Sequence, residues 1–161
     1  MIQYDVKSYH AKASGNATTY AVRLKGVTVT SGTVSARNIA IADPTASKSG
    51  TWSRSGTTVT VTINGNGLTN GQRVFLDVAA GTTMRDGVYE VSNVTTNTFT
   101  VTSATSGTAS GTVTMYTNIY FEADTYNTIG LPVYVPGEGI YCPNGIFVGL
   151  GSSVTATVLY G

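Results

Sequence analysis

The chain has 161 residues, a formal net charge of +1, and charged side chains at only 11% of its positions. A charge this close to zero excludes a nucleic-acid binder that works by neutralising phosphates, and the single cysteine, Cys142, excludes an internal disulfide. No apolar run is long enough to span a membrane. The first residues lack the basic and apolar regions of a secretory signal, so we expect a complete product made in the cytoplasm.

The first third of the chain predicts short strands separated by polar turns. Residues 7–15 show no clear period and are expected to form a loose arm. The strands predicted after this arm cover residues 19–24, which Gly26 ends, then 27–30, 33–35 and 38–42. The last of them stops at Asp43-Pro44, because proline lacks the ladder donor and restricts the residue before it. Thr45 to Ser49 are small and polar and predict a linker.

The central stretch, residues 50–116, is rich in Thr, Val, Gly, Ser and Asn, arranged in pieces of strand length. Residues 58–63 alternate strictly between threonine and an aliphatic residue, which predicts one apolar and one hydroxyl face. Asn-Gly pairs between residues 64 and 71 supply the positive-φ positions of tight turns. Five strands are predicted, over 58–63, 73–78, 88–94, 98–102 and 111–115. A turn signal between each of them is typical of a small β-sandwich or barrel.

The last segment, residues 117–161, is richer in aromatic residues and prolines. Alternation predicts strands over 118–123, 146–148 and 153–160. Three of the four prolines lie between residues 131 and 145, where they favour sheet edges or loop corners. Five of the ten tyrosines belong to this segment. Tyrosine suits an interface, because it buries apolar area while its hydroxyl stays in contact with water.

Neither flank of the central stretch is large enough to fold readily alone. We therefore predict an all-β protein in which residues 1–49 and 117–161 form a discontinuous, jelly-roll-like β-sandwich base domain. Residues 50–116 are predicted to be a small β-sandwich or barrel module inserted at a loop tip, where insertions are best tolerated. The alternative is two domains in tandem, with the boundary near Ser49.

The charges are distributed unevenly along the chain. Seven bases and two acids precede residue 55, and two bases and six acids follow it. This asymmetry predicts a molecule that orients against other copies or against an oppositely charged lattice. In the alternative interpretation the charges interleave once the chain folds.

Residues able to carry catalysis are few. His10 is the only histidine, and Cys142 has no electropositive neighbour in the sequence. Asp77, Asp86 and Glu90 could supply the carboxylate pair of a glycoside hydrolase, but Asp86 is followed by glycine and is interpreted as part of a turn. The sequence contains no recognisable ligand set for a metal or cofactor. We therefore predict no enzyme, no catalytic residue and no cofactor, with a small hydrolase dependent on His10 or Asp77 as the alternative.

Several stretches carry a resemblance to a known family. They are residues 65–78 (GNGLTNGQRVFLDV), 85–91 (RDGVYEV), 97–101 (NTFTV), 140–148 (IYCPNGIFV) and 158–161 (VLYG). These stretches resemble small virion structural proteins of tailed bacteriophages, marine phages especially. The resemblance implies a structural, non-enzymatic virion component. Among such components we expect a capsid decoration (cement) protein that stabilises the assembled lattice, because the chain is short and lacks the long repetitive stalk and coiled-coil heptads of a fibre. The alternatives are a tail-associated adaptor or fibre piece, or a module that binds host glycans or a host surface protein.

The same resemblance sets the expected partners. We expect the chain to be made in the host cytoplasm, to bind the major capsid protein at the capsid surface of the virion, and to form a homo-oligomer such as a trimer. Neither a nucleic acid nor a membrane is expected as a partner. The candidate interface residues are basic, aromatic or part of the proline-rich loop: Arg23, Lys25, Arg37, Tyr126, Tyr134, Pro136 and Tyr141.

Overall fold

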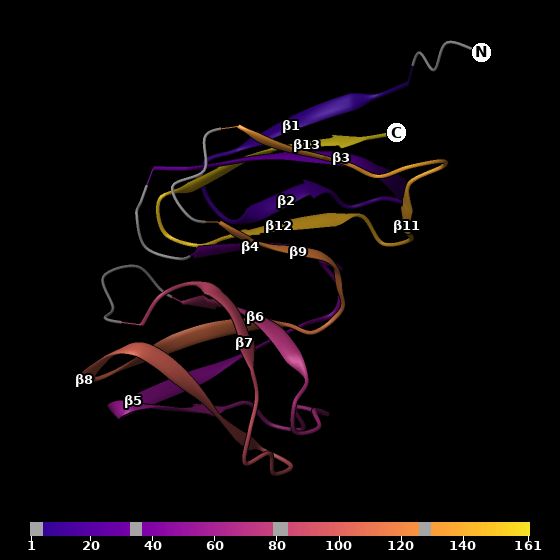
Figure 1. The fold of residues 1–161 in the computed structure, drawn as a ribbon. Coiled ribbons are helices and arrows are strands. Elements are labelled where there is room, and N and C mark those ends of the chain that lie inside the picture. Colours follow the sequence, from indigo (N-terminus) through magenta and orange to yellow (C-terminus); the bar gives the residue numbers. More distant parts are fainter. Residues whose placement is uncertain (1–4, 33–36, 79–83, 126–129) are drawn as a thin grey trace.

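The computed structural model of the chain describes residues 5–32, 37–78, 84–125 and 130–161. These residues form thirteen strands, β1 to β13, and no helix. The strands belong to three antiparallel sheets, here called A, B and C, which lie one above another as three layers (Figure 1). The predicted all-β class is confirmed.

Sheets A and B form a sandwich. Sheet A contains, in spatial order, β1 (Lys7–Ala11), β13 (Val154–Tyr160), β3 (Val22–Ser31) and β10 (Leu131–Tyr134), with β11 (Ile140–Cys142) also paired to β3. Sheet B contains β2 (Gly15–Thr18), β12 (Ile146–Leu150), β4 (Arg37–Ala42) and β9 (Ile119–Thr125). The four-strand orders β1-β13-β3-β10 and β2-β12-β4-β9, connected in this way, form a jelly roll to which β11 is added, so the predicted jelly-roll-like sandwich is also confirmed.

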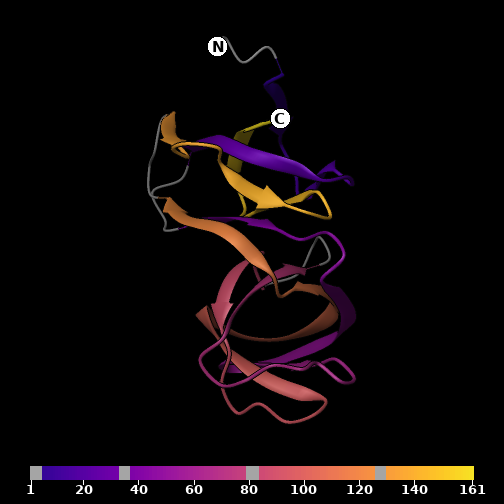
Figure 2. The same ribbon diagram turned by 90° about the vertical axis from the view of Figure 1, so that its right-hand side faces the viewer.

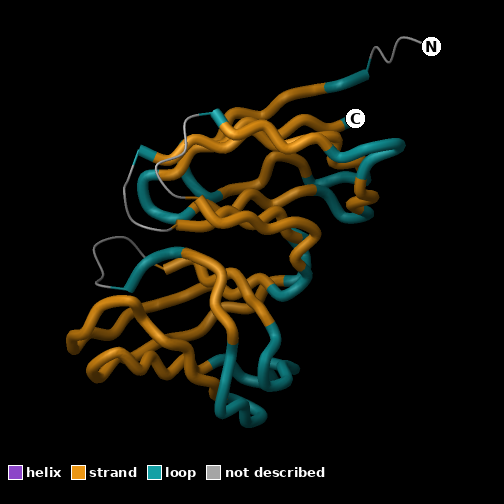
Figure 3. Tube along the Cα trace, viewed as in Figure 1, coloured by secondary structure: helices purple, strands orange, loops and turns teal. Residues whose placement is uncertain are grey.

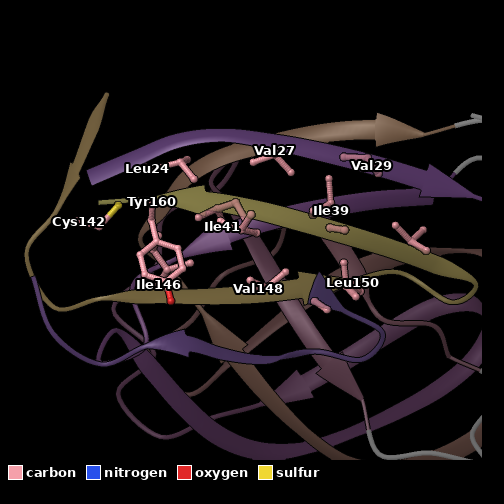
Figure 4. Close-up of a cluster of buried hydrophobic side chains, with 14 of the residues drawn as sticks. Leu24, Val27, Val29, Ile39, Ile41, Cys142, Ile146, Val148, Leu150 and Tyr160 are labelled. Carbon is pink, nitrogen blue, oxygen red and sulfur yellow. The ribbon is translucent and has the colours of Figure 1, made fainter. Parts of the chain in front are cut away.

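The core of the sandwich lies between β3 and β13 of sheet A and β4 and β12 of sheet B (Figure 4). Val27 and Val29 from sheet A face Ile39, Ile41 and Val148 from sheet B, and all of them are buried. Strict alternation along β13 places Val154, Ala156, Val158 and Tyr160 in this core, as its sequence predicts.

The N-terminal part differs from the sequence-based prediction. The loose arm predicted over residues 7–15 is wrong, because β1 pairs with β13 from Lys7 to Ala11 and β2 pairs with β12. Their partners are supplied by the end of the chain, which local periodicity cannot reveal. The strand predicted over residues 19–24 begins only at Val22 and continues past Gly26 to Ser31. The predicted strand over 33–35 lies outside the described residues.

Sheet C contains β5 (Ser47–Thr62), β8 (Thr98–Tyr116), β6 (Arg73–Val78) and β7 (Gly87–Glu90), in that spatial order. The two strands predicted over 98–102 and 111–115 are one long strand, and the linker predicted over 45–49 already belongs to β5 from Ser47 onward. The small residues between the two predicted strands do not form a turn. They stay in β8 because residues Ser47 to Gly56 of β5, which are also mostly small, pair with them.

The long ribbon formed by β5 and β8 bends back on itself. Its register shifts between Gly56 and Thr58, where β8 contributes several extra residues. The bend brings Gly50 so close to the far end of the same strand that an added Cβ would lie 2.1 Å from the carbonyl oxygen of Thr62. The bent ribbon encloses a separate core around Trp52, Val61 and Phe99, which gives sheet C its curled shape (Figure 2).

Sheet C packs against the outward side of sheet B. Ala40, Ala42 and Phe147 of sheet B form a buried cluster with Phe75 and Val88 of sheet C. Gly149 permits this contact, since an added Cβ would lie 2.7 Å from the Phe75 ring. The side chain of Asn38 adds two hydrogen bonds, because its Oδ1 accepts from the Val88 N–H (2.9 Å) and its Nδ2 donates to the Val88 carbonyl (3.3 Å).

The chain enters sheet C after β4 and returns from it before β9, two strands that are neighbours in sheet B. Sheets A and B are therefore built from residues 7–42 and 119–160, called the sandwich below, and sheet C from residues 47–116, called the module. The division into two domains that we predicted stays a prediction. Figure 3 shows both connections between the two parts as short loops on the same side.

Folding removes the charge asymmetry that the sequence shows. Residues 5–46 and 117–161 carry five bases and five acids, and residues 47–116 carry four bases and three acids. The alternative interpretation, in which the charges interleave, is the one that the topology supports. Any oriented binding must therefore come from a local group of residues.

Candidate functional site

The outer face of sheet A points away from the module (Figures 1 and 2). We call it the distal face. Its residues alternate with the core residues of the same strands and are half-buried or exposed. They are His10 of β1, Arg23, Lys25 and Thr28 of β3, Pro132 and Tyr134 of β10, Tyr141 of β11, and Thr155, Thr157 and Leu159 of β13.

Cross-strand register brings a cation and an aromatic ring together on this face. Arg23 is the direct partner of Tyr141, and its guanidinium carbon lies 5.5 Å from the centre of the Tyr141 ring. Such a cation–π contact attracts the guanidinium to the face of the ring. The same guanidinium forms an ion pair with Glu138, with Nη2 at 3.3 Å from Oε2.

Residues 135–139 form the loop between β10 and β11, and backbone bonds hold it beside β3. The N–H of Val135 donates to the carbonyl of Lys25 at 3.0 Å. Gly139 has a φ of 82°, and an added Cβ there would lie 2.3 Å from the carbonyl oxygen of Leu24, so only glycine fits. Lys25 Nζ donates to the carbonyl of Glu138 at 2.8 Å.

Two tyrosines of the distal face are unusually exposed. Tyr134 is 74% exposed and Tyr141 is 57% exposed. Tyr134 lies opposite Gly26 in the register, and an added Cβ at Gly26 would lie 3.6 Å from its ring, an ordinary van der Waals distance. Exposed aromatic rings next to arginine are the composition found at the energetic centres of protein interfaces.

Five of the seven predicted interface residues lie together on or beside the distal face. They are Arg23, Lys25, Tyr134, Pro136 and Tyr141, and Pro136 is an exposed residue of the loop. Arg37 lies apart from them at the start of β4, where burial and the nearby charge of Arg85 lower its pKa. Tyr126 lies outside the described residues.

Sequence reasoning missed Glu138. No local pattern marks it, because its contact with Arg23 joins residues that are 115 positions apart in the chain. The available signal is its position in the proline-rich loop between two glycines that need a positive φ, Gly137 and Gly139.

A cleft of about 830 Å³ lies between the sandwich and the module, beside their packed contact. Asp77 and Asp86 of the module and Lys12 of the sandwich contribute its charged groups. Burial raises the pKa of both carboxyls; for Asp86 a hydrogen bond from the Val78 N–H (2.7 Å) opposes the rise, and the charge of Asp77 adds to it. The third candidate carboxylate, Glu90, lines a different cleft, which it shares with Asp86, Arg37 and Arg85.

The two candidate nucleophilic residues, His10 and Cys142, lie at the surface of β1 and in the sandwich core, respectively. His10 is exposed, and its Nδ1 lies 3.0 Å from the hydroxyl of Thr157. Cys142 is buried in the sandwich core, and burial raises the pKa of its thiol to about 11. A thiol with that pKa stays protonated at neutral pH and is a poor nucleophile.

Within the described ranges, no group of three or more His, Cys, Asp and Glu side chains is placed to hold a metal ion. The same residues contain no helix with the length and apolarity needed to cross a membrane. Comparison with protein-family models, with curated protein sequences and with solved structures finds no match for this chain.

Proposed function

We propose that the chain is a non-enzymatic virion structural protein that decorates an assembled capsid. In this proposal the distal face binds the major capsid protein, and the module points into solvent on the opposite side. The observation that carries it is the gathering of Arg23, Lys25, Tyr134 and Tyr141 on the distal face, which is directed away from the module.

The composition of the distal face favours a protein partner. Tyrosine and arginine contribute large contact areas with few rotatable bonds, and they recur where interfaces are most tightly packed. Three of the six remaining residues of the face are threonines, whose hydroxyls can form the polar rim of such an interface. The jelly roll is used by viral capsid proteins and also by lectins, so the fold is compatible with the proposal without selecting it.

The contacts between the sandwich and the module support a rigid presentation of the module. The stacked rings of Tyr116 and Phe147, with centroids 3.7 Å apart, and the two hydrogen bonds of Asn38 join the layers. A decoration protein that binds only the assembled lattice stabilises it by mass action, because binding lowers the free energy of that state alone. A closed homo-oligomer, such as a trimer on a local symmetry axis, would add its own interface to this effect.

The experiment that tests the proposal is the copy number of the chain per purified virion, measured by quantitative mass spectrometry against the major capsid protein. We expect a ratio close to a simple fraction of the capsid protein. A few copies per particle would overturn decoration and indicate a tail adaptor or fibre piece. Absence from the particles would overturn the virion assignment and favour a host-surface or glycan-binding module.

A further inference from the structure

The ion pair between Arg23 and Glu138 lies at the surface of the distal face. The side chain of Arg23 is 40% exposed and that of Glu138 is 84% exposed. An ion pair in such contact with water contributes little to stability, because solvent screens it and holding two long side chains costs conformational entropy. A second carboxylate arriving from outside can therefore replace Glu138 at a small cost in free energy.

The position of the loop does not depend on this ion pair. Backbone hydrogen bonding between Val135 and Lys25 and the close approach of Gly139 to Leu24 hold the loop against β3. Lys25 binds the backbone carbonyl of Glu138 and not its carboxylate. The Glu138 side chain can thus leave the guanidinium while the loop stays in place.

From these contacts we propose that Glu138 occupies, within the free protein, the position that a carboxylate of the partner takes on binding. Arg23 and Lys25, flanked by the rings of Tyr134 and Tyr141, would then recognise an acidic protein surface. This inference rests on the proposed function, and it adds the chemistry of the partner and an internal competitor for it.

Charge complementarity selects an acidic partner. The cluster holds two cations, Arg23 and Lys25, against one carboxylate, Glu138. The neighbouring positions on β3 and β13 are threonines and Leu159, which carry no charge. Arg23 Nη1 donates to the carbonyl of Gly139 at 3.5 Å, and Nη2 is held by Glu138. When Glu138 leaves, Nη2 can form a charge-assisted hydrogen bond to an incoming carboxylate, which is stronger than a bond to a neutral group.

The test compares four single variants of the full chain with the wild type. Arg23→Glu reverses the charge of the cluster, and Arg85→Glu is the matched reversal on an exposed arginine of the module. Glu138→Gln removes the internal competitor, and Glu90→Gln is the matched change on an exposed glutamate of the module. Binding is measured to purified capsids that lack this chain and, separately, to a fluorescent decaglutamate peptide. Thermal unfolding of each variant checks that the fold is kept.

We expect Arg23→Glu to weaken capsid binding at least about tenfold and Glu138→Gln to strengthen it about two- to fivefold, the range that an exposed ion pair can supply. The capsid affinity of both control variants should stay within about twofold of the wild-type affinity. The part of the affinity that depends on Arg23 and Lys25 should decrease as the salt concentration rises. The decaglutamate peptide should show the same ranking at lower affinity.

Three results would count against the inference or its basis. Capsid binding that is tight but equal in all variants would overturn the acidic-partner inference and leave decoration standing. Equal strengthening by Glu138→Gln and Glu90→Gln would show a net-charge effect and overturn the role of Glu138. If the wild type fails to bind capsids, decoration is overturned; the recognition of carboxylates then stands or falls on the ranking with decaglutamate.

Discussion

Sheets A and B are two layers of one jelly roll, yet their surroundings differ. Along β13 of sheet A, buried residues alternate with half-buried ones, whereas all five residues of β12 in sheet B are buried. Sheet B has the sandwich core on one side and the module on the other, and sheet A has the core on one side only. Sheet B therefore joins the two parts of the molecule, whereas the outer face of sheet A stays exposed.

The largest expected effect comes from an aromatic ring between sheet B and the module. Phe147 is buried, stacks on Tyr116 and meets Phe75 edge-on with centroids 6.0 Å apart. We expect Phe147→Ala to lower the free energy of unfolding by about 3–5 kcal/mol, because it leaves a cavity between two layers. Urea denaturation measures the change.

The matched variant on sheet A is Tyr134→Ala, which removes an aromatic ring that is mostly in water. Its free energy of unfolding should stay within about 0.5 kcal/mol of the wild type. Similar losses for Phe147→Ala and Tyr134→Ala would contradict the distinction between the joining layer and the free face.

The next effect concerns Asp43, at the end of β4 where the chain leaves sheet B. Burial alone would raise the pKa of this carboxyl, but hydrogen bonds from Asn144, Thr45 and Asn118 outweigh it and lower the pKa to about 2. A folded-state pKa below the ordinary value means that the ionised carboxylate stabilises the fold. Asp43→Ala should therefore cost about 2–3 kcal/mol at neutral pH.

The sign of this effect fixes its pH dependence. The stabilisation by Asp43 is complete above the ordinary carboxyl pKa of 3.8 and is lost as the pH falls through about 2. The difference between wild type and Asp43→Ala in urea denaturation should therefore shrink across this acid range. A difference that does not change with pH would show that packing, and not the charge, is responsible.

A smaller effect is expected at Asn38 of sheet B, whose side chain forms two hydrogen bonds to the backbone of β7 in the module. Asn38→Ala leaves the N–H and the carbonyl of buried Val88 without these bonds. The expected cost is about 1–3 kcal/mol, with faster hydrogen exchange at the Val88 amide. Asn70→Ala is the matched control, since Asn70 accepts from the Val94 N–H in an exposed loop; an equal cost there would argue against a specific joining role for Asn38.

The smallest effect has the opposite sign. Burial in the cleft raises the pKa of Asp77, so its ionised form is disfavoured in the folded state. The wild type gains stability below the ordinary carboxyl pKa and loses it as the pH rises through the raised one. Asp77→Asn should thus raise the melting temperature slightly at pH 7 and leave it unchanged in acid; a lower melting temperature at pH 7 would instead indicate that the carboxylate has a stabilising partner.

Part of this structure could be read from local patterns. Period-two alternation predicts β13, and the consecutive apolar residues of 39–42 and 146–148 mark the strands that become β4 and β12 of the doubly covered sheet B. Asn-Gly pairs predict turns, and Gly65, Gly67 and Gly71 do adopt positive φ values. These features depend on a few neighbouring residues, which is why the sequence suffices for them.

The candidate site is the opposite case. Composition pointed to Arg23, Lys25, Tyr134, Pro136 and Tyr141 as interface residues, but nothing in the order of the residues placed them on one surface or separated Arg37 from them. Glu138 was missed because its contact with Arg23 is made only after β10 and β11 align with β3.

Local patterns in the sequence are enough to predict that this chain is all-β and where most of its strands lie. The folded structure was needed to show that residues 7–11 are a strand, that β8 is continuous, and that the charges interleave. The two groups of features differ in the range of the interactions behind them. Alternation and turn preferences act between neighbours, whereas β1 is stabilised by β13 at the other end of the chain, and the distal face is assembled from strands more than a hundred residues apart.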